Sequence, residues 1–185
     1  NIGLFWSFYN HLTVLLIQPR QTGKSFNTDQ LMTGLMQWHT KKSDILLLTK
    51  DSDLRDRNID RLKAIQKVIP SYLRTNSKKD TDNKESMYNA IMENTYGTAV
   101  GQNSPSNASN AGRGFTVPIM HVDEIAHIKF IEEMLQAASP ATTEARDIAK
   151  SAGAPYGNIY TTTAAKLDTA SGKYIYKTFY QSGAA

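Results

Sequence analysis

Residues 12–25 read LTVLLIQPRQTGKS, and this stretch decides the fold class. It begins with a short, mostly apolar run rich in branched side chains, which is typical of a strand buried on both faces of a parallel sheet. After a polar loop, Leu31, Leu35 and Trp38 recur at helical spacing, which predicts a helix with one buried face over residues 25–40. A loop that contains Gly23 therefore joins a buried strand to an amphipathic helix.

The alternation of strand and helix continues along the chain. Further buried strands are predicted at 44–49, 116–122 and 157–163, with a hairpin or two short strands within 87–100. Helices are predicted at 51–70, 130–140, 142–151 and 174–179, with Pro140 as a helix stop. The polar stretches 75–86 and 102–114 are expected to form an exposed connection and a mobile loop. This order predicts an α/β fold in which helices cover both faces of a mostly parallel sheet.

Composition narrows the class of protein. A chain of 185 residues with 40% hydrophobic and 21% charged residues has the size and composition of one globular domain. The absence of cysteine excludes a disulfide framework and a thiolate metal site. The net charge of +4 is compatible with a polyanionic partner without requiring one. The apolar runs are much shorter than the ~20 residues that cross a bilayer, so no membrane association is expected.

The loop of residues 18–25 has the composition of a phosphate-binding loop. Such a loop needs backbone amides at a helix N-terminus, a lysine that reaches the β- and γ-phosphates, and a hydroxyl ligand for Mg²⁺. Gly23, Lys24 and Ser25 supply these groups in that order. Gln18 stands where the usual pattern has its first glycine, so a surface turn with an incidental lysine is the alternative interpretation.

Two acidic residues follow the strand predicted at 116–122. An ATP-hydrolysing site needs one carboxylate for the Mg²⁺ shell and another that orients and deprotonates the attacking water. Asp123 and Glu124 fit these roles, because the carboxyl ends of parallel strands share one edge of a sheet with the phosphate loop. We expect the two sites to meet on adjacent strands. The alternative is an acidic pair that only caps a helix.

Other side chains are candidates for the same site. The strand at 157–163 ends in three threonines, whose hydroxyls can hydrogen-bond the γ-phosphate or the water, although threonine also favours strands for packing alone. Arg20 lies inside the phosphate loop and can add positive charge near the γ-phosphate or contact a carboxylate. Arg113 lies between two glycines and can be presented to another subunit as an arginine finger, although an exposed arginine is usually a solvated charge.

Taken together, these segments resemble the ATPase domain of the large terminase subunit of tailed bacteriophages. The resemblance extends from about residue 12 to residue 179 and rests on four stretches: QPRQTGKS, AGRGF, IMHVDEIAHI and YTTTAAK. It implies a P-loop NTPase fold of the RecA-like ASCE class. Terminases carry a phosphate loop, the Walker A motif, without its first glycine and with an internal arginine, which matches Gln18 and Arg20.

The resemblance also implies roles for individual residues. The nucleotide-binding residues are Gln18, Pro19, Arg20, Gln21, Thr22, Gly23, Lys24 and Ser25. Asp123 of the Walker B motif holds Mg²⁺ together with Ser25, and Glu124 activates water. Arg113 is the arginine finger that acts on a neighbouring subunit, and Arg20 assists catalysis. The coupling residues are Thr161, Thr162 and Thr163.

The function that this resemblance implies is ATP hydrolysis that drives viral double-stranded DNA into a procapsid. ATP and Mg²⁺ are the expected cofactors. Double-stranded DNA, the portal protein and the small terminase subunit are the expected partners of a homo-oligomeric ring in the cytoplasm of the infected bacterium. Residues 1–185 are expected to form a single ATPase domain, a fragment without the C-terminal nuclease of full-length terminases. The family's adenine-contacting segment also has no match in this sequence.

Other classes of protein would share part of this pattern. A helicase-like DNA translocase would share the loop and the acidic pair, but it normally needs a second RecA-like domain. A small-molecule kinase would need a basic lid and an acceptor pocket, whereas Glu124 beside Asp123 favours water as the nucleophile. A nucleotide-binding scaffold would hold ATP without turnover. Hydrolysis that rises with protein concentration would favour the motor over the scaffold.

Overall fold

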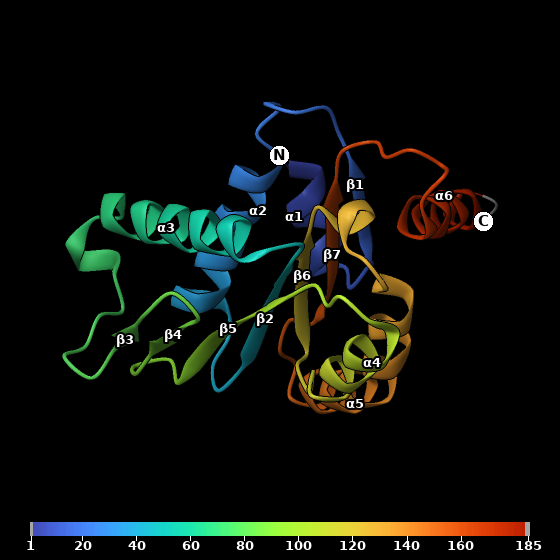
Figure 1. Cartoon of the computed structure of the whole chain (residues 1–185). Coiled ribbons are helices and arrows are strands. Elements are labelled where there is room, and N and C mark those ends of the chain that lie inside the picture. The colour runs from blue at the N-terminus through green and yellow to red at the C-terminus, as the bar shows by residue number, and fades with distance from the viewer. Residues whose placement is uncertain (1, 184–185) are drawn as a thin grey trace.

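A seven-stranded sheet runs through the middle of the molecule, and the computed structural model describes residues 2–183 around it. The strands are β1 (Val14–Ile17), β2 (Asp44–Thr49), β3 (Thr81–Asp82), β4 (Ser86–Asn89), β5 (Asn94–Val100), β6 (Ile119–Asp123) and β7 (Gly157–Thr162). They lie in the order β1-β7-β6-β2-β5-β4-β3, and the first five in this order run parallel (Figure 1). β4 and β3 extend one edge as antiparallel strands. The predicted mostly parallel sheet is confirmed.

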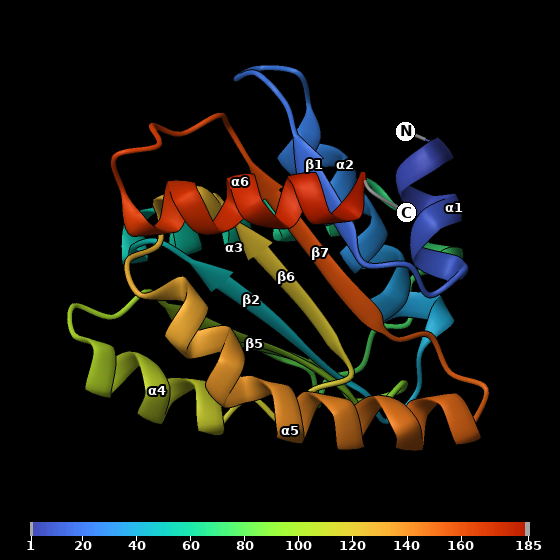
Figure 2. The same cartoon turned by 90° about the vertical axis from the view of Figure 1, so that its right-hand side faces the viewer.

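Helices cover both faces of this sheet, as predicted. The α-helices of the described residues are α1 (Ile2–Tyr9), α2 (Lys24–Gly34), α3 (Ser52–Val68), α4 (Pro105–Arg113), α5 (Ile131–Ser151) and α6 (Ala170–Ser182). Shorter turns are the π-helical Leu35–His39 and the 3₁₀-helical Ser71–Leu73 and Ile125–His127. α1, α2 and α3 pack on one face, and α4, α5 and α6 pack on the other (Figure 2). Among these helices, none has the length and apolar character needed to cross a bilayer.

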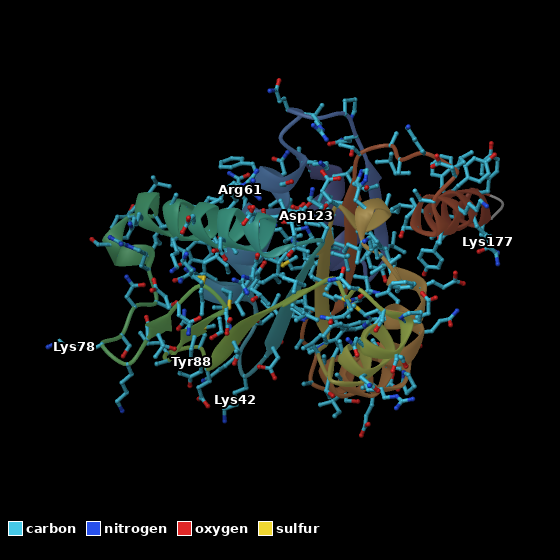
Figure 3. All side chains as sticks on the ribbon, viewed as in Figure 1. Lys42, Arg61, Lys78, Tyr88, Asp123 and Lys177 are labelled. Atoms are coloured by element: carbon cyan, nitrogen blue, oxygen red, sulfur yellow. The ribbon has the colours of Figure 1, made fainter. Side chains whose placement is uncertain are left out.

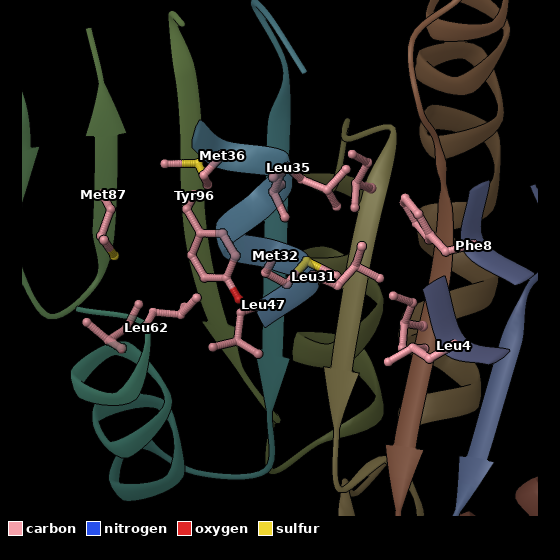
Figure 4. Packing of buried hydrophobic residues seen from close by; sticks show 14 residues of the cluster. Leu4, Phe8, Leu31, Met32, Leu35, Met36, Leu47, Leu62, Met87 and Tyr96 are labelled. Carbon is pink, nitrogen blue, oxygen red and sulfur yellow. The ribbon is translucent and has the colours of Figure 1, made fainter. Parts of the chain in front are cut away.

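The central strand β2 contributes to a hydrophobic core on each face. Ile45 and Leu47 pack beneath α2 and α3, whereas Leu46 and Leu48 face α4 and α5. Figure 4 shows Tyr96 of β5 beside Leu47 in the first of these cores. Fully burying a leucine side chain such as that of Leu47 stabilises a fold by roughly 1.5–3 kcal/mol. The continuous apolar run of β2 is needed because both of its faces are buried.

Two local features set the ends of α2 and α3. α3 begins where predicted, because the Asp51 carboxylate accepts a hydrogen bond from the Leu54 amide at 2.8 Å. After α2, the chain makes the wider π-helical turn Leu35–His39, which rotates Trp38 away from the apolar stripe. Trp38 is 43% exposed, so its predicted place on the buried face is wrong. Its indole N–H donates to the Leu73 carbonyl at 2.7 Å.

The stretch 102–114, predicted to be a mobile loop, contains the helix α4. The Ser104 hydroxyl caps this helix by accepting a hydrogen bond from the Asn107 amide at 3.2 Å. The small side chains of α4 let it lie close to α5: a Cβ atom on Gly112 would lie 2.2 Å from the carbonyl oxygen of Met134. The low hydrophobicity of this stretch therefore reflects close helix packing and not a loop.

The helix α5 is continuous through Pro140, where a stop was predicted before a second helix at 142–151. Proline removes one backbone hydrogen bond, here to the carbonyl of Gln136. Both residues are exposed, so water can satisfy that carbonyl. The buried side of the helix continues across the proline through Ala138 and Thr142. Figure 2 shows that α5 changes direction along its length, so the helix is continuous but bent, as a proline inside a helix commonly causes.

The remaining differences lie at the edge of the sheet and at the start of the chain. The hairpin predicted within 87–100 is formed by β4 and β5, and β5 also pairs in parallel with β2. The exposed connection predicted at 75–86 includes the short strand β3. No prediction anticipated α1, in which Leu4 and Phe8 are buried one turn apart. α1 has only eight residues, which is too short for a helical repeat to stand out in the sequence.

Candidate active site

The phosphate loop and the acidic pair meet at the carboxyl ends of three parallel strands. β7 lies between β1 and β6, so the expectation that the two sites follow adjacent strands is wrong. The chain after β1 nevertheless reaches across the end of β7: Lys24 and Ser25 contact Glu124 and Asp123, respectively. The lysine loop and the acidic pair therefore lie in contact, as predicted, although β7 separates the two strands that they follow.

The loop before α2 leaves a helix N-terminus open to a ligand. Gly23 lies at the N-cap with φ 80° and ψ 10°, a left-handed conformation that favours glycine, and no side chain caps the helix. The Thr22 hydroxyl donates to the Pro19 carbonyl at 2.9 Å and closes the loop on itself. The backbone N–H of Gln18 donates to the Thr162 carbonyl at 3.1 Å, which continues the hydrogen bonding between β1 and β7. Uncapped amides at this end of α2 form a typical anion site.

Lys24 and Glu124 form an ion pair at the centre of the site. The Lys24 Nζ lies 2.7 Å from Glu124 Oε1, and Lys24 is only 7% exposed. The other carboxylate oxygen of Glu124 accepts hydrogen bonds from the backbone N–H and the hydroxyl of Thr163, both at 3.1 Å. Burial opposes ionisation of Glu124, but the hydrogen bonds from Lys24 and Thr163 outweigh it and lower its pKa. Glu124 is therefore held as a carboxylate.

The backbone of Glu124 is also unusual. Its φ of 56° and ψ of 44° lie in the left-handed region, which costs energy for a residue with a side chain. Such conformations concentrate at functional sites, where the surrounding structure imposes them. Here the turn between β6 and the following 3₁₀ turn directs the carboxylate back toward Lys24.

Asp123 is the buried anchor of the site. It is 1% exposed, and its Oδ1 accepts a hydrogen bond from the Thr161 hydroxyl at 2.7 Å, with the Ser25 hydroxyl at 3.5 Å. Its Oδ2 accepts one from the Asn58 side-chain amide at 3.0 Å. Burial raises the pKa of Asp123, whereas the His121 ring and these hydrogen bonds lower it below the usual value. The charge of Lys24 contributes to this lowering as well.

The donor set around Ser25 and Asp123 suits Mg²⁺. A hydroxyl and a carboxylate oxygen are hard ligands, and they lie close enough together to share one coordination shell. The described residues contain no cluster of three metal-ligating side chains. Mg²⁺ typically binds through one or two carboxylates, waters and the phosphates of its nucleotide. With a nucleotide bound, the ion would neutralise charge on the β- and γ-phosphate oxygens.

The helix α3 supplies residues that the sequence did not reveal. Asn58 donates to Asp123, and Arg61 donates both to Asn58 and to the buried carboxylate of Asp29. Burial raises the pKa of Asp29 to about 7, although the charge and hydrogen bond of Arg61 oppose this rise. Figure 3 shows Arg61 and Asp123 near the middle of the molecule, whereas Lys42 and other labelled lysines project from its periphery. Arg61 therefore ties α2 and α3 to the site.

His121 is a second residue that sequence reasoning missed. Its Nε2 lies 3.1 Å from the Thr161 hydroxyl, and the ring is fully buried. Desolvation lowers its pKa to about 4, so the ring is neutral at pH 7. A signal was present in the sequence, because alternate residues of a strand share a face and His121 precedes Asp123 by two positions.

The other predicted site residues lie apart from this cluster. Thr162 faces away: its hydroxyl donates to the Thr163 carbonyl and accepts from the Ala126 amide. Arg20 is exposed in the loop and forms no ion pair with any described residue. Arg113 ends α4, lines a surface hollow with Glu133, and has no contact with the acidic pair of its own chain. The structure thus brings together the lysine loop, the acidic pair and two of the three threonines.

Comparison with known proteins gives fold relatives only. Neither a scan of protein-family models nor a search of curated proteins finds a match to this sequence. Among solved structures, the large terminase of a thermophilic bacteriophage matches with a TM-score of 0.64 at 13% identity, over 91% of this chain and 38% of that one. The HK97 bacteriophage large terminase matches with a TM-score of 0.63 at 11% identity, over 97% and 36% of the two chains.

A third match covers a separate domain. The ATPase domain of the large terminase of Thermus phage P74-26 matches with a TM-score of 0.52 at 16% identity, over 82% of this chain and 59% of that one. Another crystal form of the thermophilic phage terminase contains ADP, and it matches at 14% identity with a TM-score of 0.53. The chain spans little more than a third of the length of the first two terminases. The fold of this chain is that of the ATPase domain of phage large terminases, an α/β P-loop NTPase fold.

Proposed function

We propose that this chain binds ATP with Mg²⁺ and hydrolyses it as the motor domain of a large terminase, which drives double-stranded DNA into a procapsid. The observation that carries the proposal is the contact between the two halves of the site, in which Lys24 Nζ lies 2.7 Å from Glu124 Oε1. A lysine and a carboxylate held together under an uncapped helix N-terminus have the chemistry that phosphoryl transfer to water requires.

The proposed mechanism begins with an exchange of partners. The phosphates of ATP bind the backbone amides of the loop 18–25. The ammonium of Lys24 then leaves Glu124 and binds the phosphates, because a polyphosphate carries more negative charge than one carboxylate. Glu124 is then free to orient and deprotonate the attacking water. Ser25 and Asp123 would hold Mg²⁺, which would supply positive charge beside the phosphates, and Asn58 and Thr161 fix Asp123 in place. In the resting arrangement the ion pair keeps the base occupied until nucleotide is bound.

The proposal extends to coupling and partners. Thr163 holds Glu124 and directly precedes the segment that leads to α6, so a change at Glu124 reaches that helix through the end of β7. We infer double-stranded DNA, the portal protein and the small terminase subunit as partners, with chains assembled in a ring. DNA that raises the rate of ATP hydrolysis would support this part, and a rate unaffected by DNA at any protein concentration would remove it.

Two substitutions test the chemistry. Lys24→Ala should abolish ATP binding, because it removes the charge that contacts the β- and γ-phosphates. Glu124→Gln should retain ATP binding and lower turnover by about 10²-fold or more, since positioned general bases contribute roughly that much. Binding of a fluorescent ATP analogue and phosphate release measure the two steps. Glu85→Gln, an exposed residue on the same chain, is the matched control and should change neither.

The outcome also separates the motor from other nucleotide-binding proteins. Unchanged turnover in Glu124→Gln would remove the assigned role of this carboxylate. ATP binding without turnover at any protein concentration, with or without DNA, would identify a nucleotide-binding scaffold instead. Strand separation in the absence of procapsids would identify a helicase-like translocase.

A further inference from the structure

A small cavity lies on the face of the sheet opposite α2 and α3. Its volume is about 280 Å³, it is open to solvent on one side, and residues of α5, α6, β6 and β7 line it. Figure 2 shows α5 and α6 on this same face. Tyr160 of β7 points into it, whereas the next residue, Thr161, points to the other face and contacts Asp123. The cavity is therefore separated from the proposed nucleotide site by the thickness of the sheet.

Arg146 of α5 brings an uncompensated positive charge into this cavity. Its guanidinium donates one hydrogen bond, to the side-chain oxygen of Asn158, and its buried Nε has no partner. Within residues 2–183, no carboxylate lies within ion-pair distance of it. Burial lowers the pKa of Arg146, but a guanidinium remains protonated in proteins. A half-buried guanidinium with an unused N–H donor is a group to which an anion can bind.

The acidic residues nearest in sequence do not serve this purpose. Glu144 and Asp147 lie two residues before and one residue after Arg146 on α5, and both are exposed. Residues at these spacings point to different sides of a helix. The partner of Arg146 must therefore come from outside its own helix.

Two tyrosine hydroxyls of the cavity wall can donate hydrogen bonds beside Arg146, whereas Gln136, Ser139, Thr142 and Thr143 bring both donors and acceptors. The Asn158 amide nitrogen donates to the Tyr160 hydroxyl at 2.7 Å, so the proton of that hydroxyl is available to a ligand. Burial raises the pKa values of Tyr160 and Tyr174, which keeps both phenols protonated. Guanidinium N–H and phenol O–H groups match the oxygens of an anion and repel a cation.

We propose that this cavity is a binding site for a small oxyanion, a phosphate or a small carboxylate, held by Arg146, Tyr160 and Tyr174. The volume lies at the lower end of the range for small-molecule sites, which fits an anion of few atoms. The site is independent of the proposed ATP hydrolysis, because its residues lie on the other face of the sheet.

Titration calorimetry with inorganic phosphate tests this site. The experiment uses a Lys24→Ala background, since phosphate would otherwise also bind at the N-terminus of α2. In this background Arg146→Gln should weaken phosphate binding at the cavity by about ten-fold or more, the effect of losing a charged hydrogen bond. Any binding by the amides at the N-terminus of α2 is common to both titrations, so the difference between them reports the cavity. Lys150→Gln, which removes an exposed charge one turn along α5, is the matched control and should bind phosphate as the background does.

Additional measurements identify the anion and show whether the variants are folded. Acetate that competes with phosphate would assign the site to oxyanions in general, and phosphate binding without competition would restrict it to phosphate. Tyr174→Phe should weaken binding several-fold while leaving the Arg146 and Asn158 contact intact, so the proposal does not depend on one variant. Phosphate should raise the thermal midpoint of the background but not of the Arg146 variant. Equal phosphate affinity with and without Arg146, or no saturable binding of either anion to the background, would overturn the proposal.

Discussion

Thr161 connects two buried side chains, those of His121 and Asp123. Its hydroxyl proton is donated to Asp123 at 2.7 Å, so the His121 nitrogen 3.1 Å away must be the donor of the second bond. This assigns the tautomer of His121 with the proton on Nε2. The three residues form a chain from a neutral ring through a hydroxyl to the carboxylate that we assign to Mg²⁺.

Replacing Thr161 with valine should therefore be costly although the two side chains have nearly the same shape. Thr161→Val leaves a buried N–H of His121 without an acceptor and removes one hydrogen bond from Asp123. We expect the free energy of unfolding to fall by about 1–3 kcal/mol in urea titrations. Thr161→Ser keeps the hydroxyl and should lose much less. Equal stability of the valine and serine variants would contradict the proposed chain.

His121 makes a separate prediction about pH. The folded state holds the pKa of His121 at about 4, below the ordinary 6.5, because the ring is buried. The charge of Asp123 raises this pKa, whereas the charges of Arg61 and Lys24 lower it. The unfolded chain binds a proton below pH 6.5 and the folded chain does not, so stability falls as pH falls from about 6.5 to about 4. The loss is on the order of 3 kcal/mol. His121→Gln should show a smaller loss across this window, and parallel pH profiles would contradict the assignment.

The sequence predicted some site residues and missed others for a physical reason. Lys24 and Glu124 follow buried strands directly, so the local pattern places them at the carboxyl edge of the sheet. Asn58 and Arg61 reach the same site from the second and third turns of α3, where nothing local distinguishes them from solvent-facing helix residues. Their role depends on how α3 lies over β2 and β5 and so brings Asn58 to the end of β6, which is a long-range arrangement.

The packing of α4 on α5 depends on a glycine. A Cβ atom on Gly112 would lie 2.2 Å from the Met134 carbonyl oxygen and 3.1 Å from the Ala137 Cβ, so Gly112→Ala must push the two helices apart. We expect a loss of roughly 1–3 kcal/mol in the free energy of unfolding. Gly114→Ala is the control, because its Cβ would lie 3.4 Å from the Ala111 carbonyl oxygen and can be accommodated. If both substitutions have the same effect, the helices are not in this close contact.

Errors in the predicted elements share one cause. Strands such as β2 were predicted correctly because burial on both faces gives a continuous apolar run. α4 was missed because a helix that packs through small residues has no apolar stripe, and α5 was divided because Pro140 is a strong local breaker. In both cases contacts between helices decide the structure, and no local pattern encodes them.

At the scale of the whole molecule, the order of the strands explains how one site is assembled. The sequence places β7 last among the strands, yet it lies between β1 and β6. Insertion of β7 brings Thr161 and Thr163 under the acidic pair, where adjacent β1 and β6 would have left no room for them. Parallel pairing carries no local sequence signal for order, so this arrangement could not be predicted.

The position of Arg113 makes a prediction about assembly. It is exposed at the end of α4 and has no contact with Lys24 or Glu124 of its own chain, so we expect it to act on ATP hydrolysis in another copy. Arg113→Ala should lower turnover by about 10³-fold or more in assembled protein, the effect of known arginine fingers, and have little effect in dilute monomers.

Mixing two inactive variants tests this directly. In a mixed assembly, a chain with Arg113→Ala keeps Glu124, and a neighbour with Glu124→Gln keeps Arg113, so one complete site forms between them. ATP hydrolysis should therefore reappear on mixing and rise with total protein concentration. A mixture of Lys24→Ala with Glu124→Gln is the control, because each chain then lacks a group that its own site needs. Two results together would contradict this prediction: no rescue in the first mixture at any concentration, and an equal loss of turnover by Arg113→Ala in monomers and assemblies. Arg113 would then not act on a neighbouring subunit.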